Sequence, residues 1–106
     1  MKTQLTRGLK KRLMYAENKD GVIDGVNARI GYVTFSKTGT TIYYRGRQLQ
    51  KAKGGGIRGN FFDVETSEEY WISGVKERGS NVHWAESASV RVDEDAIAEY
   101  RAVKGK

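Results

Sequence analysis

The sequence predicts a mostly-β domain, all-β or α+β: a small bent antiparallel sheet or an SH3-like or OB-like barrel of short strands with one C-terminal helix. Two observations favour this class. Short runs of β-branched and aromatic residues alternate with turn residues at close spacing. A pattern of helical period follows near the end, at about residues 93–103. The length of 106 residues fits a single domain.

The stretch 28–48 predicts a β-hairpin on which the other strands depend. Two runs of strand-forming residues flank the turn 36–40, where Gly39 suits a left-handed conformation. In the first run, Ile30 and Tyr32 share one parity, and Val33 and Phe35 share the other. Either Gly31 hosts a bulge that resets the alternation, or both faces of a bent sheet are covered. Because an isolated hairpin is marginal in water, further strands must join it.

The remaining elements follow in chain order. Residues 1–11 are basic and poorly patterned, and we expect a disordered arm ahead of a single domain at 12–106. A second hairpin is expected around the turn 66–68, after a glycine-rich loop at 49–60. The expected strands and extended pieces are 12–17, 30–35, 40–47, 61–65, 69–73, 82–85 and 88–92.

The C-terminal helix has a recognisable start. Asp93 is in a position to cap it, and acidic residues follow in the first turn, where the helix dipole favours them. Val92 and Ile97 have the spacing of a hydrophobic staple. Ile97 and Tyr100 form an apolar stripe at helical spacing, which predicts packing against the sheet.

Charge is distributed unevenly along the chain. Residues 1–58 hold 13 Lys and Arg against 3 Asp and Glu, whereas residues 59–106 hold 6 against 10. The net charge of the whole chain is +6. A basic first part favours anionic partners, which are RNA or DNA or an acidic protein, although many basic surfaces serve solubility alone.

Several classes are excluded or disfavoured by composition. The chain has no cysteine, which excludes disulfides, a thiolate nucleophile and a cysteine-based zinc site. No apolar run approaches the ~18 residues of a membrane span, and residues 1–7 lack the apolar core of a secretory signal. We therefore expect a cytoplasmic protein without membrane association, and we expect no cofactor and no metal.

Three runs of the sequence resemble a family of small bacterial proteins without an assigned activity. They are ARIG with VTFSK at 28–37, YYRGR at 43–47 and EYWISG at 69–74. The resemblance covers about residues 12–100 and implies no reaction, cofactor or functional residue.

Basic residues interleaved with aromatics give the main candidate site. Nucleic-acid-binding sheets stack bases on aromatic faces and hold phosphates with Lys and Arg. Most aromatics in so short a chain are needed for the core, and we expect Phe35, Phe62 and Tyr70 there, while Tyr32 and Trp84 stay open. The residues expected to bind nucleic acid are Tyr44, Arg45, Arg47, Lys51, Lys53 and Arg58.

Two further features have weaker functional interpretations. The run Gly54 to Gly56 could form an anion-binding nest, although it matches no nucleotide-binding motif and is interpreted first as a connection between hairpins. His83 beside Trp84, with Glu86 nearby, could support acid–base chemistry as in an RNase-like hydrolase, but a lone histidine is more often structural. We expect a non-enzymatic nucleic-acid-binding domain; a protein-interaction module and a His83-centred enzyme are the alternatives.

Overall fold

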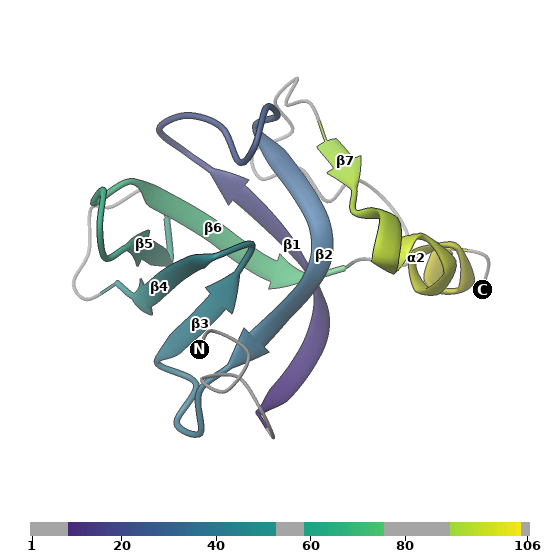
Figure 1. The fold of residues 1–106 in the computed structure, drawn as a ribbon, viewed down its shortest axis with the longest axis horizontal. Coiled ribbons are helices and arrows are strands. Elements are labelled where there is room, and N and C mark those ends of the chain that lie inside the picture. The colour runs from purple at the N-terminus through teal and green to yellow at the C-terminus, as the bar shows by residue number, and fades with distance from the viewer. Residues whose placement is uncertain (1–8, 53–58, 76–89, 105–106) are drawn as a thin grey trace.

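The computed structural model describes residues 9–52, 59–75 and 90–104. They form a closed barrel of six antiparallel strands, a seventh strand outside it and a short C-terminal helix, which confirms the predicted class (Figure 1). The strands are β1 Lys10–Asn18, β2 Ala28–Phe35, β3 Thr41–Tyr44, β4 Arg47–Lys51, β5 Phe61–Asp63, β6 Glu69–Gly74 and β7 Val90–Val92, followed by the 3-10 turn η2 Glu94–Ala96 and the helix α2 Ile97–Lys104.

The barrel closes because its first and sixth strands pair. Each strand from β1 to β6 is hydrogen-bonded to the next, and β6 pairs with β1, with Ala16 opposite Ile72. Ten residues serve as the barrel core: Met14, Ala16, Ile23, Val33, Ile42, Tyr44, Leu49, Phe61, Tyr70 and Ile72.

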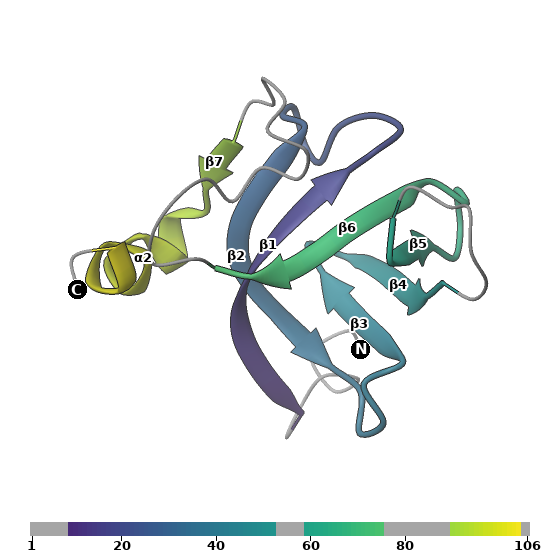
Figure 2. The ribbon, with the colours of Figure 1, turned by 180° about the vertical axis from the view of Figure 1, so that it is seen from behind.

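The strands β1 and β2 are covered on both faces. Their outward residues Tyr15, Ala28 and Ile30 form a second cluster, onto which Val92 and Tyr100 pack. The helix and β7 lie beside the outer side of β2, away from β4 and β5, in both views (Figures 1 and 2). The pairing of β1 with β2 runs without interruption, so the proposed bulge at Gly31 is wrong and the alternative of a sheet covered on both faces is confirmed.

The predicted single strand at 40–47 is two strands with a tight turn between them. Arg45 and Gly46 have φ values of 47° and 79°, a pair of left-handed residues typical of a two-residue hairpin turn. Residues 47–51, predicted as part of a loop, form β4 and pair with both β3 and β5. The predicted turn at 36–40 is confirmed, with Gly39 at φ 77°.

The start of β1 and the orientation of the residues of β5 also differ from the prediction. Lys10 and Lys11 pair with Phe35 and Thr34, so they belong to β1 and not to a disordered arm, while residues 1–8 lie outside the described residues. In the second hairpin Phe61 is buried and Phe62 points outward, which reverses the predicted parity of the first strand. Phe35 is partly buried against the barrel core and Tyr70 is fully buried, as predicted.

Candidate nucleic-acid interface

One end of the barrel is built around a buried carboxylate. The side chain of Asp93 accepts hydrogen bonds from Arg29 Nη1 at 3.0 Å and from the Tyr44 hydroxyl at 2.5 Å. Arg45 Nη1 lies 3.3 Å from the same carboxylate. Arg29 is itself buried and also donates to the backbone carbonyls of Ile23 and Asp24. Buried charges of this kind are stable only when they are paired. We therefore assign the cluster a structural role at this end of the barrel.

Local backbone geometry explains how Asp93 reaches this position. Its N–H donates to the carbonyl of Ile30, which continues the parallel pairing of β7 with β2 by one residue. The carboxylate and the Tyr44 hydroxyl lie against Gly31, where a Cβ would be 2.1 Å from Asp93 Oδ2. Asp93 precedes the helix as predicted. Its side chain makes no capping hydrogen bond, because the carboxylate accepts hydrogen bonds from Arg29 and Tyr44 of the barrel instead.

A second carboxylate holds the two arginines of the β3–β4 hairpin. Asp24 Oδ2 lies 2.6 Å from Arg45 Nε, and Asp24 Oδ1 lies 2.9 Å from Arg47 Nη2. Hydrogen bonds first from Arg47 and then from Arg45 hold the pKa of Asp24 well below its usual range. We call the six residues of the two clusters the paired end: Asp24, Arg29, Tyr44, Arg45, Arg47 and Asp93.

Three of the predicted binding residues therefore have structural partners. Tyr44 is 3% exposed, so its ring cannot stack on a base without unfolding. Burial, and then the hydrogen bond to Asp93, raise the pKa of its hydroxyl. Arg45 and Arg47 both form ion pairs with Asp24, so their charges are partly compensated. The predicted Lys53 and Arg58 lie outside the described residues.

Lys51 belongs to a different group of cations, which lies at the other end of the barrel from the paired end. The basic rim, as we name it, consists of Lys10, Lys11, Arg12, Lys37 and Lys51. Arg12 and Lys51 share strand parity with the core residues Met14 and Leu49 and lie just beyond them at the mouth of the barrel. Within the described ranges no carboxylate forms an ion pair with any of the five.

A carboxylate close to Lys11 and Arg12 already accepts a hydrogen bond from a tyrosine. Glu99 on α2 lines a hollow together with Lys11 and Arg12, and it accepts a hydrogen bond of 2.7 Å from the Tyr32 hydroxyl. That hydrogen bond raises the pKa of Tyr32. Lys11 Nζ lies 4.9 Å from the centre of the Tyr32 ring, which is within cation–π range.

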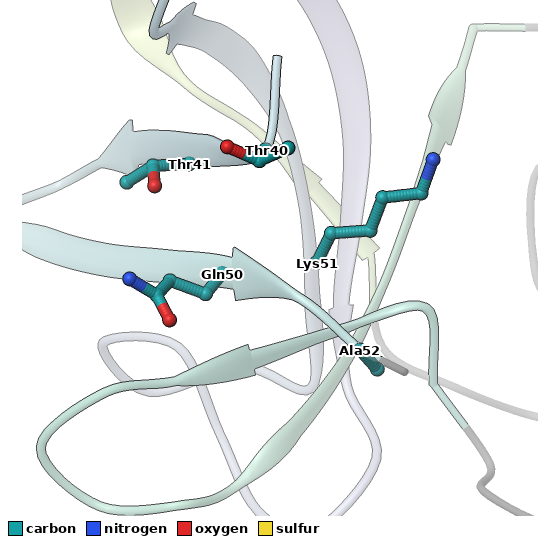
Figure 3. A pocket seen from close by; sticks show the side chains of 5 residues that line it. All are labelled: Thr40, Thr41, Gln50, Lys51 and Ala52. Carbon is teal, nitrogen blue, oxygen red and sulfur yellow. The ribbon is translucent and has the colours of Figure 1, made fainter. Parts of the chain in front are cut away.

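A hollow of about 430 Å³ lies beside Lys51 of the rim, at the start of β3 and the end of β4. Figure 3 shows Thr40 and Thr41 where β3 begins and Gln50, Lys51 and Ala52 where β4 ends, with the side chain of Lys51 pointing away from that of Gln50. The described part of the lining combines two hydroxyls, an amide and one ammonium group, and none of these described residues carries a carboxylate. This composition suits an anionic, hydrogen-bonding ligand.

His83, Trp84 and the run Gly54 to Gly56 lie outside the described residues. Among the residues that the structure describes, no group of His, Asp or Glu has the arrangement of a metal site. No helix formed by the described residues is long and apolar enough to span a membrane.

Comparisons with known proteins add no family assignment. No family model, curated protein or solved structure matches this chain. The resemblance to small bacterial proteins stays a prediction.

Sequence reasoning identified Lys51 but missed the rest of the basic rim. Lys10, Lys11 and Arg12 were assigned to an arm or to the start of a strand, although Arg12, Met14 and Ala16 alternate with one parity. That alternation was the available signal, because it places Arg12 just past the core. The pairing of Asp24 with the hairpin arginines joins residues 21 and 23 positions apart and leaves no local pattern in the sequence.

Proposed function

We propose that this protein is a non-enzymatic nucleic-acid-binding domain that holds the phosphate backbone at the basic rim. The observation that supports it is the difference between the two ends of the barrel. Every cation of the paired end forms an ion pair with Asp24 or Asp93, whereas those of the basic rim have no carboxylate partner in the described residues. Cations without a carboxylate partner at one end of the barrel create a positive potential there, which attracts a polyanion.

The chemistry of the rim fits phosphate. Lysine and arginine neutralise phosphates and release the counterions condensed on the polymer, which drives binding of any sequence. The hydroxyls of Thr40 and Thr41 supply further donors beside Lys51. The rim therefore provides charge and hydrogen bonds at one place, as a backbone-holding surface requires.

Titration of the full chain against fluorescent RNA and DNA oligonucleotides at two or more salt concentrations tests the proposal. Five phosphate contacts give a slope of log K against log salt of about −3.5 to −4.5. Lys37→Gln with Lys51→Gln should weaken binding and reduce the magnitude of the slope by about 2.

Arg47→Gln is the matched control, since it removes a cation of the same hairpin region that is already paired. It should lower stability slightly and leave the salt slope unchanged. Absence of binding at low salt contradicts the proposed function. Equal loss of binding in Arg47→Gln and in the double variant contradicts the assignment of the rim.

A further inference from the structure

We propose that the nucleic acid is single-stranded and that its bases lie on the outer face of β3, β4 and β5. This inference rests on the proposed function and deepens it by naming the form of the ligand. The outer face, as we define it, consists of Thr41, Tyr43, Gln48, Gln50 and Phe62.

Strand alternation puts these five side chains on one surface. The buried apolar residues are Ile42 and Tyr44 in β3, Leu49 in β4 and Phe61 in β5, all of which belong to the barrel core. Their neighbours in sequence consequently point away from the barrel. The helix α2 covers the other side of the molecule, beside β1 and β2, and leaves this face uncovered by described residues (Figures 1 and 2).

The register aligns the outer face into two adjacent rows. Thr41 lies opposite Gln50, and Gln50 lies opposite Phe62, so a hydroxyl, an amide and an aromatic ring follow one another across three strands. Neighbouring strands are ~4.8 Å apart, and this row therefore spans about 10 Å. The second row places Tyr43 opposite Gln48.

The rows carry the groups that unstacked bases require. Tyr43 and Phe62 are partly exposed and offer aromatic surface for stacking. The side chains of Gln48 and Gln50 are exposed and make no hydrogen bond with other described residues, so their donors and acceptors are free for base edges.

The hollow connects the outer face to the basic rim. Thr41 and Gln50 belong to both the first row and the lining of the hollow, and Lys51 follows Gln50 on the opposite side of β4 (Figure 3). A strand whose bases stack on Phe62 and Tyr43 can thus place phosphates near Thr40 and Lys51. Rows of aromatics beside a cationic edge are how single-strand-binding sheets work, and a duplex hides the base faces that such rows contact.

Glu69 limits the outer face on the β6 side. It lies opposite Phe62, and its carboxylate accepts a hydrogen bond of 3.1 Å from the Gly59 N–H. Glu69 therefore marks the border of the outer face next to Phe62, on the side away from Thr41 and Gln50.

The test compares single-stranded and duplex oligonucleotides of equal length, as RNA and as DNA, with the intact chain. We expect tighter binding of the single strands, and we expect Phe62→Leu and Tyr43→Leu each to weaken it by roughly 5- to 100-fold, the range of one stacked base. Leucine keeps apolar bulk, and thermal unfolding verifies that each variant is folded. The control Tyr100→Leu makes the same change on α2, outside the outer face, and should leave affinity unchanged.

The outcomes separate this inference from the proposed function. Failure of the wild-type chain to bind any oligonucleotide overturns both. Equal or tighter binding of the duplex, or unchanged single-strand affinity in folded Phe62→Leu and Tyr43→Leu, overturns the inference and leaves the function intact. Quenching of tyrosine fluorescence by single strands in wild type, lost in Tyr43→Leu, supports stacking on this face.

Discussion

At the residue scale, Asp93 is the side chain on which the paired end depends. It is 6% exposed and accepts from Arg29 and Tyr44 while facing Arg45. A buried carboxylate is stable here because two hydrogen bonds and a further ion pair compensate its charge. Removal of the Asp93 carboxylate leaves the buried guanidinium of Arg29 without a counter-charge. The resulting loss of folding stability is larger than the net stability that the ion pair contributes.

Asp93→Asn should therefore lower the free energy of unfolding by about 3 kcal/mol. The measurement is denaturant unfolding followed by circular dichroism. Asp95→Asn is the matched control, because Asp95 is exposed two residues later and should change stability by less than about 0.5 kcal/mol. Equal effects of the two substitutions would contradict the assigned role of Asp93.

Gly31 provides a second test at this scale. A Cβ at Gly31 would overlap Asp93 Oδ2 and lie 2.9 Å from the Tyr44 hydroxyl. Gly31→Ala should cost about 2 kcal/mol, because both buried groups must shift. Gly74→Ala on β6 is the control, since a Cβ there has no heavy atom within 4 Å. A Gly31→Ala variant as stable as wild type in the same unfolding assay would show that the carboxylate has room to move.

At the element scale, Asp24 joins the loop between β1 and β2 to the β3–β4 hairpin. Its pKa is held below the ordinary value by Arg47 and Arg45, so the contacts contribute stability above the unfolded-state pKa of about 3.9. That contribution is lost as the pH falls toward the lowered value of the folded state. Because Asp24 is 40% exposed, solvent limits the effect to about 1 kcal/mol or less.

A comparison of wild type with Asp24→Asn from pH 7 to pH 2 tests this link. Wild type should be the more stable at pH 7, and the difference should diminish below about pH 4 as the carboxyl becomes protonated. Denaturant midpoints at each pH give the difference directly. A difference that stays constant over the whole range would mean that the ion pairs contribute nothing.

The elements also show which parts of the fold can be predicted from sequence. The turn at Gly39, the hairpin around residues 66–68 and the helix after Asp93 all have local signals, and all three are present. The strand β4 was missed because Arg45 is an uncommon residue in a left-handed turn position. The burial of Tyr44 and the orientation of Phe61 and Phe62 depend on pairing with other strands. The alternation of residues along one strand could therefore not predict which of these side chains face the core.

At the scale of the whole molecule, two cores share the strands β1 and β2. The barrel core lies inside, and the second cluster lies between the outer face of β1 and β2 and the C-terminal elements. Tyr15 and Ala16, adjacent in sequence, are both fully buried on opposite faces. Within the described residues, the second half of β1 and the first half of β2 are consequently buried on both faces.

Native-state hydrogen exchange should rank the strands accordingly. Amides at the centres of β1 and β2 should open only with global unfolding, while those of the three-residue β5 should exchange through local opening. The measurement is exchange by NMR or mass spectrometry at low denaturant. Slower exchange in β5 than in β2 would contradict a barrel supported from both sides of β1 and β2.

The position of Asp93 has a consequence for biosynthesis. A ribosome delivers all six barrel strands, and with them Arg29 and Tyr44, before it delivers the carboxylate that these two residues share. A barrel that closes before that point would hold the Arg29 guanidinium without its carboxylate partner, so the paired end can form only after residue 93 has left the exit tunnel.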